Sequence, residues 1–158
     1  MVGFPVRMRA GSHSTAAILP LLTTTWAQSA PYNNHCPIYM EDIRSMSGCL
    51  ATAMAQVMYY HQWPKAATKA IPGYTTSTNS IDLTAGLPAT TFDWANMKDS
   101  YSENDYTADE ANAVATLMQY CGHAVWMDYG SASVSYMTWA ALALKEYFDY
   151  NISGDGSE

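Results

Sequence analysis

Residues 47–64 read SGCLATAMAQVMYYHQWP, the clearest structural signal in the chain. Apolar residues recur at helical spacing from Leu50 to Met58, which predicts one long helix. Gly48 permits a tight turn at its start, and Pro64 forces its end a few residues earlier. We therefore expect a helix over 49–61. Its several alanines let neighbouring elements approach closely, which places the helix in the middle of the domain.

Cys49 is the first residue of this helix, a position with chemical consequences. Unpaired backbone N–H groups and the positive end of the helix dipole favour the ionised sulfur, which is the nucleophilic form. The alternative is that Cys49 is a buried core residue, because free cysteine is among the most buried residue types. The helix terminus alone does not decide between a nucleophile and a core residue.

Composition limits the classes of protein to which the chain can belong. Its 158 residues are enough for one domain that buries a core without a metal or disulfides. The net charge is −7 and no cluster of Lys or Arg occurs, which argues against a nucleic-acid-binding surface. The apolar segment at 16–22 is too short to span a bilayer and weak as a signal peptide. Only 13% of residues are charged, from which we expect a secreted or extracytoplasmic bacterial protein.

Cysteine spacing argues against a metal or redox centre. Cys36, Cys49 and Cys121 cannot all pair with one another, so at least one thiol stays free. The sequence has no C-x-x-C pair and no closely spaced Cys/His set that could form a tetrahedral site. A metal-binding or redox protein is therefore the weakest hypothesis, and we expect no cofactor.

The flanking and connecting segments are less regular. We expect residues 1–18 to be a disordered lead or the remnant of a propeptide junction, and 152–158 to be a disordered tail. Residues 32–46, with Asn33-Asn34 and Pro37, are predicted to form an ordered loop that leads into the Cys49 helix. Short strands are expected around 73–76 and 80–83 in a segment rich in Thr, Ser, Gly and Pro.

A second and a third helix follow. Thr107-Ala108-Asp109-Glu110 is a capping box, and the apolar stripe after it ends at Cys121, which makes Cys121 a core residue. Gly122 is expected to end this helix. We then predict a short strand over 123–129, a turn over 130–133, and a helix over 136–148 whose stripe comprises Met137, Ala140, Ala141, Leu144 and Phe148.

Together, these segments resemble the nucleophile half of a known peptidase family. The Cys49 helix, with Gly48 before it and Tyr60-His61 and Pro64 at its end, is similar to the nucleophile helix of the streptopain family (peptidase family C10) of papain-like cysteine peptidases. Other segments match the family in order and rough spacing: Pro20-Leu21-Leu22, Trp26-Ala27-Gln28, Pro31-Tyr32-Asn33, 92–97, 127–130 and 143–150. The match covers about residues 19–151, which is more specific than any single motif.

The resemblance implies a fold and two site residues. The fold is α+β, papain-like, and truncated after the helical nucleophile half at 19–151. Cys49 takes the place of the nucleophile, and Gln28 takes that of the glutamine whose side chain joins the backbone N–H of Cys49 in the oxyanion hole. Without the flanking Trp26 and Pro31-Tyr32-Asn33, Gln28 reads as an ordinary surface residue.

None of the histidines fits the catalytic position. His61 lies roughly 18 Å along the helix from Cys49 and cannot touch the sulfur. Gly122-His123-Ala124 imitates the family's Gly-His-Ala, but it precedes 127–130, whereas the family's catalytic histidine follows that segment. His35 and His13 match no family position. The sequence contains no later Gly-Gly-His segment.

We therefore expect the nucleophile half of a secreted streptopain-type endopeptidase that acts on proteins or peptides. A C-terminal half that supplies the histidine is expected as its partner, and the chain alone should be inactive. Such a half-domain should expose apolar surface where its partner packs. The alternative is a non-catalytic peptide-binding module or a degenerate relic of a peptidase.

Overall fold

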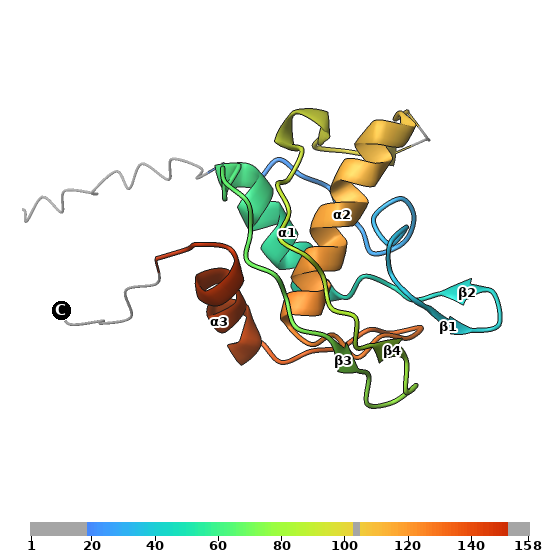
Figure 1. Cartoon of the computed structure of the whole chain (residues 1–158). Helices are drawn as coiled ribbons and strands as arrows, with labels where there is room; N and C mark the ends of the chain where they lie inside the picture. Colours follow the sequence, from blue (N-terminus) through green and yellow to red (C-terminus); the bar gives the residue numbers. More distant parts are fainter. Residues whose placement is uncertain (1–18, 103–104, 152–158) are drawn as a thin grey trace, which may run out of the picture.

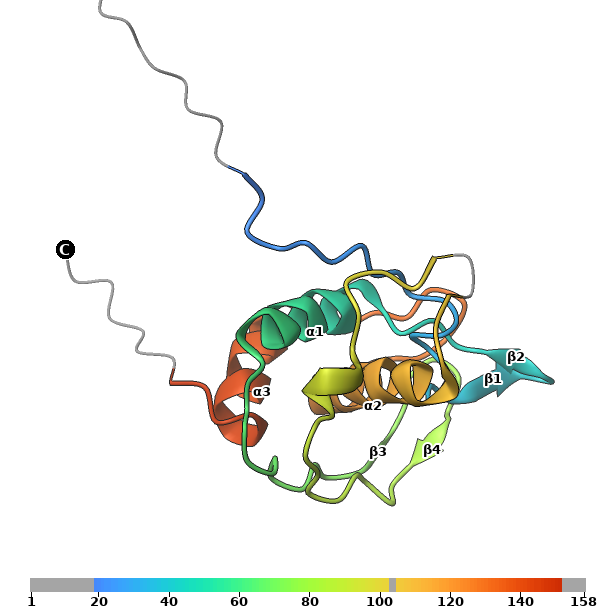
Figure 2. The same cartoon turned by 90° about the horizontal axis from the view of Figure 1, so that it is seen from above.

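Two helices cross at the centre of the molecule (Figures 1 and 2). They are α1, Cys49–His61, and α2, Ala108–Ala124. The computed structural model describes residues 19–102 and 105–151. The expectations for 1–18 and 152–158 lie outside the described residues. No helix of the described part is long and apolar enough to cross a membrane.

The predicted helix over 49–61 is confirmed at both ends. It begins at Cys49 and ends at His61, where Gln62 takes the left-handed conformation, with φ 45°. The Gln62 backbone N–H donates to the Tyr59 carbonyl at 3.0 Å, and the Trp63 N–H donates to the Met58 carbonyl at 3.1 Å. These bonds satisfy carbonyls that a helix end leaves without partners, so the chain turns away before Pro64.

The start of α2 is confirmed as a capping box. The Thr107 hydroxyl accepts from the Glu110 N–H at 3.2 Å, and the Glu110 carboxylate accepts from the Thr107 N–H at 2.7 Å. This reciprocal pair satisfies two backbone donors that the helix itself cannot. The first turn also carries Asp109 and Glu110, whose negative charges interact favourably with the positive end of the helix dipole.

The predicted end of α2 is wrong. The helix does not stop at Gly122 but continues to Ala124, so His123 is helical and 123–129 forms no strand. Gly122 is required for packing instead, because a Cβ there would lie 2.2 Å from Tyr129 Oη. The chain reverses at Trp126, in the left-handed conformation with φ 55°, and Met127 and Tyr129 return into the core.

The core lies where α1 and α2 pack against each other. Met58, Leu117 and Cys121 are fully buried there, and Cys121 Sγ lies 3.6 Å from Met58 Sδ. Cys121 is therefore a core residue, as predicted. Each buried Leu or Met side chain contributes about 1.5–3 kcal/mol of hydrophobic stabilisation.

The third helix, α3, spans Thr138–Tyr147 and packs against α2. It is slightly shorter than the predicted 136–148. Of the predicted stripe, Phe148 is fully buried but Met137 and Ala141 are exposed. The stripe is wrong at these two positions because α3 has few neighbours and buries little more than Ala143.

The strands form two small antiparallel pairs, which together with the helices confirm the α+β class. Strands β3, Tyr74–Thr75, and β4, Asp82–Leu83, lie where strands were expected. Strands β1, Ile38–Met40, and β2, Ile43–Arg44, form a hairpin inside the predicted loop 32–46, and this hairpin projects from the body (Figures 1 and 2). A short 3-10 helix, η1, covers Trp94–Asn96.

His123 is a buried group near the end of α2. It is 4% exposed, it packs edge-on against Tyr74 with ring centroids 5.0 Å apart, and its Nε2 has no hydrogen-bond partner. Burial lowers the pKa of His123, against a smaller opposing effect of the Pro72 backbone. The folded protein therefore resists protonation of this imidazole more than the unfolded chain does.

The contact of Gly122 with Tyr129 predicts a coupled pair of substitutions. Gly122→Ala should destabilise the fold by about 1–3 kcal/mol, because the new methyl group overlaps Tyr129 Oη. In a Tyr129→Phe background the cost should fall, since the clashing oxygen is gone. Urea unfolding of the two single variants and the double variant measures this coupling. Equal costs of Gly122→Ala in both backgrounds would contradict the close contact.

His123 predicts a pH dependence of stability. Its pKa is depressed in the folded state, so the unfolded chain binds the extra proton as pH falls below about 6.5, and stability declines there. Urea unfolding at pH 7.5 and 5.5 should show a larger loss for the native chain than for His123→Gln. His61→Gln controls for removal of a histidine elsewhere. A His123→Gln chain that loses as much stability as the native chain would refute this source of acid sensitivity.

Candidate active site

Cys49 is the exposed thiol of the three cysteines, all of which are free. Cys36 and Cys121 are buried, and burial raises the pKa of Cys36 to about 12 and that of Cys121 further above its usual range. Both therefore stay protonated and shielded from solvent. The core alternative for Cys49 is wrong, because its side chain reaches the surface at the start of α1.

The backbone in front of Cys49 is fixed by Gly48. Gly48 has φ 88° and ψ 142°, a conformation that L side chains rarely adopt. A Cβ on it would lie 2.6 Å from Met127 Sδ and 3.2 Å from the Ser133 carbonyl oxygen. The Gly48 carbonyl accepts from the Thr52 N–H at 3.1 Å and from Thr52 Oγ1 at 3.0 Å. These contacts set the direction in which α1 begins and thus where the sulfur lies.

A hairpin-like segment, 128–134, holds the chain just before Gly48. Its ends are joined by the bridge between Asp128 and Val134, and the turn predicted at 130–133 lies between them. Ser133 Oγ donates to the Met46 carbonyl at 2.6 Å, and the Met46 N–H donates to the Gly130 carbonyl at 3.1 Å. Residues that are far apart in sequence thus support the position of Cys49.

Gln28 is hydrogen-bonded to the segment just before Cys49. Its backbone carbonyl accepts from the Ser47 N–H at 3.1 Å, two residues before Cys49. Upstream, Thr24 Oγ1 accepts from Gln56 Nε2 at 2.7 Å, so residues 24–28 run alongside α1. This places Gln28 beside the start of the helix.

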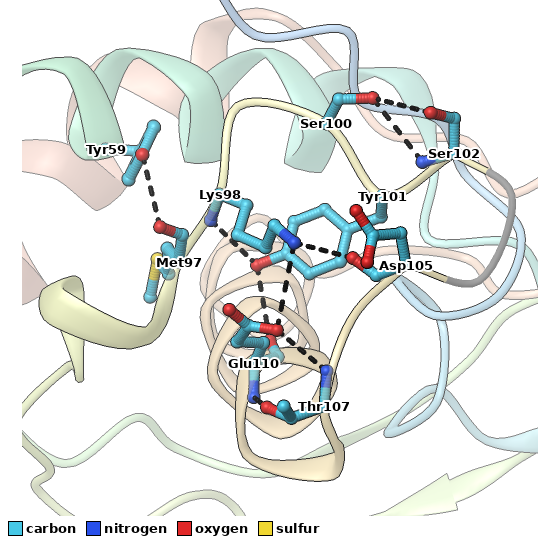
Figure 3. A network of polar contacts seen from close by, with 9 residues as sticks. All are labelled: Tyr59, Met97, Lys98, Ser100, Tyr101, Ser102, Asp105, Thr107 and Glu110. Atoms are coloured by element: carbon cyan, nitrogen blue, oxygen red, sulfur yellow. Dashed lines mark hydrogen bonds and ion pairs between the residues drawn. The ribbon is translucent and has the colours of Figure 1, made fainter.

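Trp26 anchors this N-terminal segment to the core. The indole is buried, and its Nε1 donates to the Lys98 carbonyl at 2.8 Å. Figure 3 shows the polar network that holds Lys98: its N–H donates to Tyr101 Oη at 3.1 Å, and Tyr101 Oη donates to the Glu110 carbonyl at 3.2 Å. Burial raises the pKa of Tyr101 to about 12, so the phenol keeps its proton as a donor. The start of α2 thereby supports the segment that carries Gln28.

Cys49 and Gln28 line one hollow of about 530 Å³, which we call the cysteine hollow. The structure thus brings the two predicted site residues together. Ser131 and Ala132, from the tip of segment 128–134, also line it. Sequence reasoning missed these two, because small polar and apolar residues in a turn carry no motif. The resemblance stopped just before them, at residue 130.

The described histidines lie elsewhere, and none of them lines the cysteine hollow. His61 is at the opposite end of α1, where it packs against Tyr60 and Tyr150. His35 Nε2 lies 2.8 Å from Asn112 Oδ1, and His123 is buried. His13 is outside the described residues. Within the described part there is also no group of three His, Cys, Asp or Glu side chains that could hold a metal ion.

Comparisons with known proteins identify the family of this chain. The family model of the peptidase C10 family matches residues 26–157. The chain is 33% identical over 143 residues to streptopain of Streptococcus pyogenes, covering 80% of this chain and 35% of streptopain. It is 29% identical over 149 residues to the thiol protease/hemagglutinin PrtT of Porphyromonas gingivalis, covering 92% of this chain and 16% of PrtT.

A solved structure shows the same fold. The chain resembles active wild-type interpain A, a cysteine protease of Prevotella intermedia, with a TM-score of 0.69 and 44% identity, over 82% of this chain and 54% of interpain A. A prointerpain A fragment from the same organism matches with a TM-score of 0.66 and 43% identity, over 81% of this chain and 42% of that one. The chain thus spans about half of interpain A, at 54%, and a smaller share of each of the other relatives. With its papain-like α+β fold, it belongs to the peptidase C10 family.

Proposed function

We propose that this chain carries the nucleophile half of a secreted bacterial cysteine endopeptidase of the streptopain type. The observation that carries the proposal is the cysteine hollow, where the exposed Cys49 and Gln28 lie together in a chain of the C10 family. The substrates are proteins or peptides. The bacterial sources of the relatives support a bacterial origin, and secretion stays a prediction from composition.

In hydrolysis of a peptide bond, Cys49 and Gln28 would have different roles. The Cys49 thiolate attacks the carbonyl carbon of a peptide bond, and the negative charge moves to the carbonyl oxygen. The Gln28 side-chain amide and the Cys49 backbone N–H, which the first turn of a helix leaves unpaired, donate to that oxygen. The C–N bond then breaks, the amine leaves with a proton, and water hydrolyses the resulting thioester to regenerate the thiol.

The proton for the leaving amine requires a histidine from outside the described residues. The cysteine hollow has none among its described lining residues, and the chain covers 54% of interpain A. On α1, Ala53, Val57 and Tyr60 follow Cys49 at helical spacing and are exposed, Tyr60 by 46%. An apolar stripe of this kind fits a surface on which a second half packs beside the sulfur. The chain alone is then inactive.

A non-catalytic peptide-binding module is the alternative. The observation that favours it is the same lack of a histidine in the cysteine hollow among the described residues. The two proposals differ in whether adding the rest of the peptidase domain produces turnover.

A chimera tests the role of Cys49. Residues 19–151 would replace the matching part of interpain A, so that interpain A supplies the portion this chain does not cover. We expect the chimera to hydrolyse a peptide substrate and Cys49→Ala to abolish hydrolysis, because the nucleophile is gone. The measurement is kcat/KM on a fluorogenic peptide. A folded chimera without turnover would favour the binding module, and turnover that survives Cys49→Ala would rule out the nucleophile.

In the same chimera Gln28→Ala should lower kcat by about 10²–10³-fold with little change in KM, because an oxyanion donor acts in the transition state. Gln119→Ala on α2 is a matched control that removes an amide away from the hollow, and it should leave kcat nearly unchanged. If the two variants have the same kcat, Gln28 has no part in the oxyanion hole.

A further inference from the structure

A second hollow, of about 380 Å³, lies beside segment 128–134 on the side of α3. Its walls include the rings of Tyr74, Trp126, Tyr136 and Trp139, and we call it the aromatic pocket. In Figure 1 the segment between α2 and α3 passes beside β3 in this region. The peptidase chemistry proposed above makes no use of this pocket.

Three of its rings are nearly parallel. Tyr74 and Trp126 have centroids 5.6 Å apart at 23°, and Trp126 and Trp139 have centroids 6.4 Å apart at 16°. Tyr74 is buried and anchored by its hydroxyl, which donates to the Met127 carbonyl at 2.8 Å. Trp126 and Trp139 are 53% and 42% exposed. Partly exposed indoles attract cations and planar charged groups where a ring face is accessible.

A fixed carboxylate shares the pocket with these rings. Asp128 is the one charged side chain among the described residues that line it. Its Oδ1 accepts from the Thr78 N–H at 3.0 Å and its Oδ2 from Thr78 Oγ1 at 2.7 Å, and these bonds lower the pKa of Asp128. The carboxylate is therefore ionised at neutral pH and held in one orientation. The Ser77 backbone also stabilises the ionised form. A carboxylate has about four acceptor positions, so Asp128 can still accept from a cationic partner.

We propose that the aromatic pocket binds the arginine side chain of a peptide. The charge of Asp128 selects a cation, and the indoles favour a planar one. A guanidinium meets both demands, since it stacks on aromatic faces and pairs bidentately with a carboxylate, whereas an ammonium does only part of this. An uncharged apolar side chain would leave the negative charge of Asp128 without a cationic partner.

The position of the pocket indicates where such a peptide comes from. Ser131 and Ala132, at the tip of segment 128–134, line the cysteine hollow, while Asp128 and Val134, at its base, line the aromatic pocket. An extended peptide that crosses this segment can reach both hollows. The inference rests on the proposed function only in making that peptide a substrate; the binding itself is independent of catalysis.

The test is a binding measurement on the full 158-residue chain carrying Cys49→Ala. Fluorescence anisotropy is recorded with a fluorescein-labelled Gly-Gly-Arg-Gly-Gly peptide and with versions that carry lysine, citrulline or norleucine instead of arginine. Citrulline has almost the same shape as arginine but no charge. We expect the arginine peptide to bind at least about tenfold more tightly than the citrulline peptide, and this preference to shrink as salt is raised.

Variants locate the binding. Asp128→Asn should remove the preference for arginine over citrulline, and Trp139→Leu should weaken binding of the arginine peptide about threefold. Asp82→Asn is the matched control, because Asp82 also accepts from the N–H and hydroxyl of a threonine, Thr84, but lies outside the pocket. It should leave the preference intact. Trp139 is on the surface, so its variant reports on the pocket even if Asp128→Asn unfolds.

Several outcomes would overturn the inference. Equal affinity for the arginine and citrulline peptides, tighter binding of norleucine, or no binding of any peptide contradicts an arginine site. An arginine preference that survives both Asp128→Asn and Trp139→Leu in folded protein places the site elsewhere. Because Cys49 is absent from every protein used, none of these results depends on whether the peptidase proposal holds.

Discussion

Gly48 is the constraint on which the site depends. Its positive φ lets the chain turn sharply into α1, and Met127 and Ser133 lie so close that a larger residue would displace them. The same contact therefore determines two things: where the helix that starts at Cys49 begins, and where segment 128–134 lies relative to it. Two hydrogen bonds keep this arrangement in place: Ser133 Oγ donates to the Met46 carbonyl, and the Met46 N–H donates to the Gly130 carbonyl. Packing of α1 against α2 stabilises the helix that begins at Cys49.

The site is assembled from three parts of the chain that are distant in sequence. Gln28 comes from an N-terminal segment held by Trp26, Cys49 from the start of α1, and Ser131 from the tip of segment 128–134. The polar network around Tyr101 links the first of these parts to the start of α2 (Figure 3). This organisation leaves Cys49 and the outer face of α1 open to solvent. An exposed thiol beside an apolar stripe is what the proposed half-site requires if a second half supplies the base.

The helices, and the closeness of Cys49 to Gln28, could be predicted from the sequence because their signals are local or belong to an ordered family match. The capping box at Thr107 and the apolar spacing after Cys49 act within a few residues. The end of α2 could not be predicted, because Gly122 is placed by a tertiary contact with Tyr129 rather than by a helix cap. The β1–β2 hairpin was not predicted because its strands are only three and two residues long and mostly exposed. Such short strands show no alternation of apolar and polar residues that a sequence pattern could detect. The aromatic pocket could not be predicted either, because Tyr74 and Trp139 are distant in sequence and only the folded chain brings them together.

We propose that Cys49 is a peptidase nucleophile whose general base lies outside the described residues. The decisive measurement is peptide hydrolysis by the purified 158-residue chain alone, compared with its Cys49→Ala variant. We expect no turnover above that of the variant, because the thiol lacks an imidazole that can protonate the leaving amine. Turnover by the chain alone that disappears in Cys49→Ala would contradict a general base outside the described residues, since the chain would then contain a complete active site.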